Sequence, residues 1–148
     1  MAKLTLSTGS NLGDRRELLT KALHSLVSRI GPALYVSEIV ETPAWGRKGQ
    51  PDFLNQLVIL ETGRPARGPG LPKELHRLLG IAQTVEAEAG RVRLLEWGAR
   101  TLDIDLIFLD DVRYEDDRVS LPHPWWRHRD FVTALLPEDP KFAPRYSR

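Results

Sequence analysis

The strongest constraint on the fold of this chain is the segment 100–108, RTLDIDLIF, an apolar run that contains two carboxylates one residue apart. A β-strand alternates its faces with period two, so Asp103 and Asp105 are expected to point to the same side. The other side is expected to carry the apolar residues Leu102, Ile104, Leu106 and Phe108. One face of this strand is therefore predicted to be core. The other face presents two like charges, which repel unless a positive group lies near them.

Hydrophobic periodicity elsewhere predicts further strands and two helices. Strands are expected at residues 3–8, 33–44 and 54–62, and helices at 15–30, where Asp14 is a plausible N-cap, and at 73–90. A hairpin is expected at 110–122, a short helical tail at 129–140 and a loop at 91–99. The order β-α-β-β-α-β favours an α+β split-βαβ sandwich with a mainly antiparallel sheet and helices on one face. No linker interrupts the sequence, so a single domain over 1–148 is expected.

Composition excludes several classes of protein. The 148 residues are 41% hydrophobic and 28% charged, which is typical of a soluble globular domain. A net charge of +1 argues against a general nucleic-acid-binding protein, and the absence of cysteine excludes disulfides and thiolate chemistry. The first residues carry no signal-peptide pattern, and no apolar run reaches membrane-spanning length. A cytoplasmic protein is therefore expected.

Paired carboxylates on one strand face suit a hard divalent cation such as Mg²⁺ or Mn²⁺. Such an ion is typically bound by substrate phosphates as well as by the protein. A bare D-x-D pattern is more often a solvated strand face, and a single arginine is more often a surface ion-pair partner. Here the pair is flanked by a cluster of arginines: Arg91, Arg93, Arg100, Arg118, Arg127 and Arg129. Guanidinium groups match phosphate oxygens and keep their charge. The combination favours a polyphosphate ligand.

The standard phosphate-binding loops are absent from the sequence. The stretch 63–68 has the glycine spacing of a P-loop, but Pro69 follows where lysine is required. GSNLGD, residues 9–14, either offers backbone N–H groups to an anion or is only a tight turn, and the turn is favoured. No G-x-S-x-G nucleophile elbow occurs.

A second candidate cluster is aromatic and amide. Phe53 and Asn55 share a strand face, so a planar heterocycle could stack on the ring while the amide pairs with its edge. Taken singly, Phe53 and Phe131 are more often core residues. Trp45 and Trp97 lie in glycine-containing loops, which suggests lids over a ligand.

Several separated motifs occur in the order found in one enzyme family: GSNLGDR, ETPAWG, QPDFLNQ, GRVR, WGARTLDIDLI and LPHP…RDFV. Through them the chain resembles the 6-hydroxymethyl-7,8-dihydropterin pyrophosphokinases of folate biosynthesis. The resemblance implies a ferredoxin-like fold and an ATP-dependent transferase that moves pyrophosphate to the pterin hydroxymethyl group and releases AMP.

The resemblance also implies roles for individual residues. Asp103 and Asp105 would bind two Mg²⁺ ions, and Arg91 and Arg100 would act on the phosphates. The pterin would be held by Thr42, Pro43, Phe53, Asn55 and Phe131. The ATP site would comprise Gln83, Glu86, Arg91, Trp97, Arg100, Arg118, Ser120, His123 and Arg129. Phe53 stands where the family often has tyrosine.

Two other classes of function are alternatives to this one. A non-catalytic module of the same shape would bind a heterocycle through Phe53 and Asn55 without Mg²⁺. An RNA-binding module would use Trp125, Trp126 and nearby arginines, although Trp125 and Trp126 are equally suited to be a hydrophobic anchor. The near-neutral charge and the aspartates disfavour RNA. A monomer that acts on ATP and a pterin, with no nucleic acid and no membrane, is expected.

Overall fold

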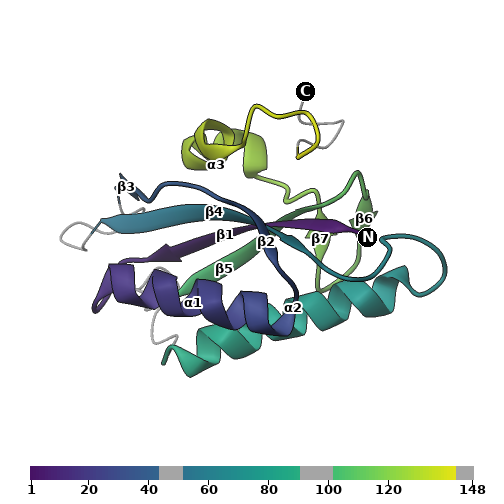
Figure 1. Ribbon diagram of the computed structural model, residues 1–148, viewed down its shortest axis with the longest axis horizontal. Coiled ribbons are helices and arrows are strands. Elements are labelled where there is room, and N and C mark those ends of the chain that lie inside the picture. Colours follow the sequence, from purple (N-terminus) through teal and green to yellow (C-terminus); the bar gives the residue numbers. More distant parts are fainter. Residues whose placement is uncertain (44–51, 91–101, 143–148) are drawn as a thin grey trace.

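Helices cover one face of an antiparallel sheet, and a short helix lies on the opposite face (Figure 1). The computed structural model describes residues 1–43, 52–90 and 102–142. The strands are β1 Lys3–Ser10, β2 Ala33–Val36, β3 Val40–Thr42, β4 Phe53–Glu61, β5 Asp103–Leu109, β6 Tyr114–Glu115 and β7 Ser120–Leu121. The helices are α1 Arg15–Arg29, α2 Leu71–Glu88, the 3₁₀ turn η1 Trp126–His128 and α3 Asp130–Leu135.

The sheet has the order β2-β4-β1-β5, with β3 also paired to β4, and every pairing in it is antiparallel. The connection through α1 passes over β4, and the connection through α2 passes over β1. Each β-α-β unit is therefore split by a strand from the other unit, which confirms the predicted α+β ferredoxin-like class. In the described residues α1 and α2 cover one face, whereas α3 lies on the other.

The strand predicted over residues 33–44 is wrong in one respect, because it is divided into β2 and β3. Ser37 causes the division. Its hydroxyl oxygen accepts a hydrogen bond from the Leu57 N–H at 2.8 Å, and its carbonyl accepts from the Gln56 side chain at 2.9 Å. The Ser37 N–H still donates to the Leu57 carbonyl at 2.9 Å, but the Leu57 N–H is bound by the Ser37 hydroxyl and not by a backbone carbonyl, so the regular ladder is interrupted here.

The boundaries of α1 follow the predicted signals. The Asp14 carboxylate accepts a hydrogen bond from the Glu17 N–H at 3.2 Å, so it is the N-cap. After the helix, Gly31 lies so close to β4 that an added Cβ would sit 1.8 Å from the Glu61 carbonyl oxygen. Only glycine fits there. Helix α2 begins two residues before the predicted start, with proline in its first turn.

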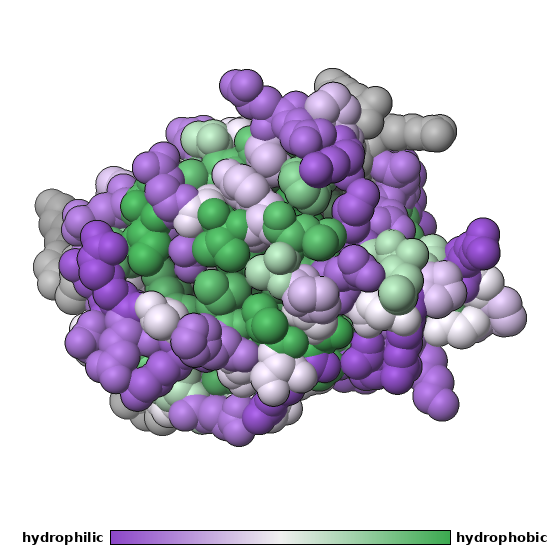
Figure 2. Space-filling view, in the orientation of Figure 1, coloured by the Kyte–Doolittle hydropathy of each residue, from purple (hydrophilic) through white to green (hydrophobic). Residues whose placement is uncertain are grey.

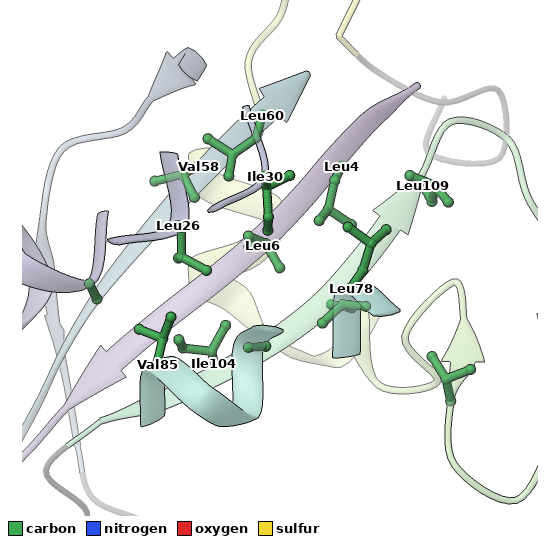
Figure 3. Packing of buried hydrophobic residues seen from close by; sticks show 14 of the residues in the cluster. Leu4, Leu6, Leu26, Ile30, Val58, Leu60, Leu78, Val85, Ile104 and Leu109 are labelled. Atoms are coloured by element: carbon green, nitrogen blue, oxygen red, sulfur yellow. The ribbon is translucent and has the colours of Figure 1, made fainter. Parts of the chain in front are cut away.

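The main core fills the space between the sheet and the two long helices (Figure 3). Figure 3 shows side chains of β1, β4 and β5 pointing toward those of α1 and α2, among them Leu4, Leu6, Val58, Leu60, Ile104, Leu26, Leu78 and Val85. All of these residues are buried. Burial of this apolar surface is the principal stabilising contribution to such a sandwich.

A bulge in β5 places Phe108 on the opposite face from the one predicted. Leu6 pairs with Leu106, but Thr5 pairs with Phe108, so Ile107 is an extra residue that resets the alternation. Ile107 and Phe108 both join the second cluster, beneath η1 and α3. The Phe108 ring meets the Trp126 ring edge-on, with centroids 5.0 Å apart.

The free edge of the sheet at β2 is short. Figure 2 shows apolar side chains in the region between α1 and α3, and Val36 of β2 is 41% exposed. A four-residue strand offers few backbone groups to another chain. None of the helices in the described ranges has both the length and the apolar composition that a membrane span requires.

Candidate active site

The face of the sheet opposite α1 and α2 brings the two predicted clusters together. Gly9 of β1 pairs with Asn55 on one side and with Asp103 on the other. Ser7 pairs in the same way with Leu57 and Asp105. Directly paired residues project to the same face, so the amide and the two carboxylates share one surface. We call this surface, on the side of the sheet away from α1 and α2, the open face. The predicted alternation of Asp103 and Asp105 around buried Ile104 is confirmed.

Arg129 supplies the positive group that the paired carboxylates require. Its Nη1 lies 2.6 Å from Asp105 Oδ2, and both side chains are about one-third exposed or less, at 34% and 27%. Arg129 occupies the junction between η1 and α3, so those two short elements place the guanidinium over the open face. The pair offsets part of the repulsion between Asp103 and Asp105.

His123 lies in the same charged environment and has a defined orientation. Its backbone N–H donates to the Ile107 carbonyl at 2.9 Å, and its Nδ1 accepts from the Trp125 N–H at 3.1 Å. Burial lowers the pKa of the imidazole, the Asp105 charge raises it, and Arg129 lowers it further. The ring is therefore neutral at neutral pH, with the proton on Nε2, which leaves Nε2 as a donor.

At the Asn55 end, Gly9 forms the floor of the site. A Cβ on Gly9 would lie 2.9 Å from Asn55 Oδ1 and 3.6 Å from Phe53 Cδ1. The Asn55 amide is buried, at 6% exposure, and its Nδ2 donates to Thr42 Oγ1 at 2.5 Å. Pro43, which follows Thr42, is exposed. Ring, amide and bare backbone thus meet at one end of the open face.

Gly9 was missed as a site residue because the sequence placed it in a turn. The structure places it inside β1. The available signal was a glycine directly after an alternating strand pattern, which often marks close approach of a ligand or side chain. The turn interpretation holds for the following residues, where Gly13 has a φ of +79° and Asp14 caps α1.

Phe131 lies in α3, on the same face of the sheet as Asn55. It is half-buried and packs against the cluster that contains Leu57 and Phe108. Its position over the open face is compatible with the predicted stacking role, and the contact with the cluster also explains it as a packing residue.

Trp126 and Trp125 differ sharply. Trp126 is 6% exposed and packs on Phe108, so the anchor prediction is confirmed for this residue. It is wrong for Trp125, which is 61% exposed. The Arg127 guanidinium lies 4.7 Å from the centre of the Trp126 ring. A nucleic-acid platform made of both tryptophans is therefore not formed.

The predicted nucleotide residues on α2 approach from the other side of the sheet. Gln83 is exposed, one turn before Glu86. Glu86 is buried, at 8% exposure, and its Oε2 accepts a hydrogen bond from the Ile104 N–H at 2.8 Å. Glu86 therefore contacts β5 between the two aspartates.

Arg118 and Ser120 lie in the β6–β7 hairpin. Asp116 fixes this hairpin: its carboxylate accepts from the Arg118 N–H at 2.8 Å and from the Tyr114 hydroxyl at 2.8 Å. It also lies 2.6 Å from Nε2 of His76 on α2. The Tyr114 hydroxyl above all, together with backbone N–H groups, holds the pKa of Asp116 well below its usual range. The hairpin is thus tied to α2.

Three predicted residues, Arg91, Trp97 and Arg100, lie outside the described residues, as do Arg93 and Trp45. Their roles stay predictions.

The chemistry of the described carboxylates fits Mg²⁺. Asp103 and Asp105 are hard oxygen donors on one face, and the described residues contain no group of three or more acidic or histidine side chains that would enclose a metal. Mg²⁺ is commonly held by one or two carboxylates, with waters and substrate phosphates as its other ligands. Two carboxylates on one face beside Arg129 and His123 therefore suit a metal–polyphosphate complex.

Residues 5–138 match the family described as 7,8-dihydro-6-hydroxymethylpterin-pyrophosphokinase.

Three curated relatives agree with this match, and each of the three is named 2-amino-4-hydroxy-6-hydroxymethyldihydropteridine pyrophosphokinase. The protein of Porphyromonas gingivalis is 39% identical over 141 residues, which cover 92% of this chain and 89% of the relative. That of Aquifex aeolicus is 36% identical, covering 95% and 82%. That of Methylorubrum extorquens is 34% identical, covering 93% and 82%.

Solved structures support the fold. The wild-type HPPK-DHPS of Plasmodium falciparum with SDX-DHP superposes with a TM-score of 0.57 at 13% identity, over 98% of this chain. The same protein with pterin and p-hydroxybenzoate gives a TM-score of 0.58 at 12% identity. This chain spans 41% and 40% of those two chains.

Proposed function

Because the chain belongs to the 7,8-dihydro-6-hydroxymethylpterin-pyrophosphokinase family, we propose that the open face of its sheet is the active site, with Asp103 and Asp105 as the Mg²⁺ ligands. The enzyme is a transferase of folate biosynthesis. It transfers pyrophosphate from ATP to 6-hydroxymethyl-7,8-dihydropterin, with the pterin diphosphate and AMP as products.

The observation that carries the site assignment is the row of residues across three strands. Asn55, Gly9 and Asp103 are directly paired neighbours, and Asp105 follows on the same face. A heterocycle bound at Asn55 thus lies on the same surface as the carboxylates that hold the metal. Substrate positioning of this kind contributes a large part of the rate of phosphoryl-type transfers.

In the reaction, the pterin hydroxymethyl oxygen forms a bond to the β-phosphorus of ATP. The bond from that phosphorus to the α,β-bridging oxygen breaks, AMP leaves with this oxygen, and the hydroxyl proton is released. The negative triphosphate repels an incoming oxygen, so neutralisation of its charge is the main catalytic requirement. When bound, two Mg²⁺ ions supply charge neutralisation to the triphosphate oxygens.

Two groups of the chain add a positive charge and a hydrogen-bond donor at the same face. Arg129 pairs with Asp105 in the structure and presents its remaining N–H groups at the same face, where a phosphate oxygen can accept them. His123, neutral with its proton on Nε2, donates a hydrogen bond without giving up a proton at working pH. His123 is held at this face by backbone contacts, and Arg129 is held there by its ion pair with Asp105.

The pterin end is organised by the hydrogen bond from Asn55 to Thr42. This bond fixes the orientation of the amide, because Nδ2 is committed to the hydroxyl and Oδ1 faces Gly9. In the proposal, Asn55 and the backbone near Thr42 and Pro43 bind the pterin edge. Phe53 and Phe131 sandwich its ring.

The motif resemblance supports the other parts of the proposal. Arg91 and Arg100 contact phosphates, Trp97 covers the nucleotide, and Gln83, Arg118 and Ser120 lie on the nucleotide side. On composition, a cytoplasmic monomer that binds no nucleic acid is proposed.

The decisive experiment incubates the chain with ATP, Mg²⁺ and 6-hydroxymethyl-7,8-dihydropterin and separates AMP from ADP. AMP is expected in a one-to-one ratio with the pterin diphosphate, and EDTA should abolish both. Formation of ADP would contradict pyrophosphate transfer. Pterin binding that is independent of Mg²⁺, with no AMP, would favour the non-catalytic binding module.

A further inference from the structure

Glu86 breaks a local rule of helix chemistry. It lies in the last turn of α2, where the helix dipole disfavours a negative charge, and that turn contains no basic residue. It is also buried, at 8% exposure, where a carboxylate requires hydrogen-bond or charge partners from other parts of the chain. A glutamate in this position therefore indicates a tertiary role.

The tertiary contact is to the main chain of β5. Glu86 Oε2 accepts a hydrogen bond from the Ile104 N–H at 2.8 Å. In the described part of the sheet, β5 is an end strand paired only with β1, so its outward-facing backbone groups require other partners. Figure 3 shows Val85 of α2 beside Ile104, which places the end of this helix against the beginning of the strand.

Ile104 is the residue between the two aspartates. Its side chain points into the core, and those of Asp103 and Asp105 point to the open face. The strand rises about 3.3 Å per residue, so fixing the peptide N–H of residue 104 also fixes the adjoining backbone of 103 and 105. A carboxylate on the helix-covered side is therefore connected to the pair on the open side through one peptide unit.

We propose that Glu86 is a positioning residue that anchors β5 at Ile104 and thereby sets the separation and direction of the Asp103 and Asp105 carboxylates. This inference rests on the proposed role of these aspartates as Mg²⁺ ligands. It assigns Glu86 an action through the main chain, which differs from direct contact with the nucleotide.

The test compares two substitutions at Glu86. Glu86→Leu removes the acceptor, whereas Glu86→Gln retains a carbonyl oxygen that can accept from the Ile104 N–H. Calorimetry measures the Mg²⁺ concentration at half-maximal binding of a non-hydrolysable ATP analogue. The leucine variant should require about 10 to 100 times more Mg²⁺, as removal of groups that support metal ligands commonly does. The glutamine variant should stay within about threefold of the parent.

Hydrogen exchange provides a readout that does not depend on nucleotide or metal. The Ile104 amide should exchange faster in Glu86→Leu than in the parent, and at nearly the parental rate in Glu86→Gln. Unchanged protection of this amide in the leucine variant would contradict the anchor.

Glu74 offers a matched control on the same helix. It is equally buried, at 8% exposure, and its carboxylate pairs with Arg77 and Arg64 at the other end of α2. Glu74→Leu should lower the melting temperature without moving the Mg²⁺ midpoint. An equal shift of the midpoint in both leucine variants would mean that Glu86 acts only through stability, and would overturn the proposal.

The remaining outcomes are distinct. A parent protein that binds the analogue equally with and without Mg²⁺ refutes the proposed function itself. A Mg²⁺-dependent parent with an unchanged Glu86→Leu midpoint refutes only the positioning role. A glutamine variant that retains Ile104 protection and yet loses Mg²⁺ dependence also refutes it, because the charge then acts directly. If the leucine variant does not fold, the comparison of Ile104 protection with Mg²⁺ dependence in Glu86→Gln is by itself the test of the positioning role.

Discussion

The two faces of the sheet are built from the same strands and have opposite chemistry. On the helix-covered face, β1, β4 and β5 contribute a continuous apolar layer that includes Leu6, Val58 and Ile104. On the open face, the same three strands carry Gly9, Asn55 and Asp103. In the described part of the chain, the apolar cluster on this face lies beneath η1 and α3.

This difference separates stability from chemistry. Apolar burial under α1 and α2 stabilises the sheet, so the opposite face of the same strands can carry like charges and a bare glycine. Rigid strands then hold the site groups at a fixed spacing, which loops do less well. Glu86 is one point at which the helix-covered side contacts the backbone of the site.

The largest expected effect concerns the charges of the open face. Asp103→Asn and Asp105→Asn should each reduce kcat by a factor on the order of 10² to 10³, because each weakens charge stabilisation at the transferring phosphates. Circular dichroism and a melting curve should show a folded protein. The exposed Asp117→Asn is the matched control and should keep full activity. Near-parental turnover in both site variants would contradict the assignment of the chemistry to the open face.

The converse substitution tests the helix-covered face. Leu6 is fully buried, and Leu6→Ala should lower the free energy of unfolding by about 2–5 kcal/mol through lost burial and a residual cavity. Urea unfolding measures the loss. Turnover per folded molecule, and the KM for the pterin, should stay at the parental values in the absence of urea. Val36→Ala, at the exposed edge, should change stability by only about 0.5 kcal/mol. A raised pterin KM with unchanged stability in Leu6→Ala would contradict the comparison.

Gly9→Ala sharpens the comparison by adding one methyl group to the open face. The new Cβ would lie 2.9 Å from Asn55 Oδ1, so the amide must shift. Pterin affinity should fall about tenfold, the size of effect that one misplaced methylene commonly causes in a pocket, while affinity for the ATP analogue is retained. Gly80→Ala on α2 meets no atom within 4 Å and should instead stabilise the helix by up to about 1 kcal/mol. Equal loss of both ligands in Gly9→Ala would argue against the pterin position.

The smallest expected effect lies where the apolar face carries a polar atom. Among the described residues, Thr8 Oγ1 is buried without a hydrogen-bond partner. Thr8→Val should therefore raise the free energy of unfolding, by up to about 1 kcal/mol. Thr62 is a matched control, because it is also buried, and its hydroxyl donates to the Arg64 carbonyl at 2.9 Å. Thr62→Val should lower stability by about 1–3 kcal/mol. A loss of stability in Thr8→Val would show that its hydroxyl is satisfied.

Local pattern predicted most of the fold. Alternation identified β1 and β5, the pattern of residues 54–62 identified β4, and helical spacing identified α1 and α2. The Asp14 cap was also predictable, since its hydrogen bond joins residues three apart. The placement of Asp103 and Asp105 on the same face of their strand followed from the same period-two geometry.

The failures occurred where a distant partner decides the local structure. Phe108 was assigned to the wrong face because the bulge at Ile107 is set by pairing with β1. The break at Ser37 depends on bonds to Gln56 and Leu57, on another strand. Gly9 was assigned to a turn because the close approach of Asn55 is visible only across the sheet.

The sequence by itself determined which residues alternate, which segments are helical, and that two carboxylates face one way within a set of family motifs. These properties depend on neighbours within a few positions along the chain. The tertiary structure alone decided that Arg129 neutralises Asp105, that His123 is a neutral donor, and that Glu86 holds Ile104. The contacts of Ile104 and Asp105 join residues 18 and 24 positions apart, and they exist only after strands and helices have packed, because their hydrogen bonds require geometry that the separate segments do not have.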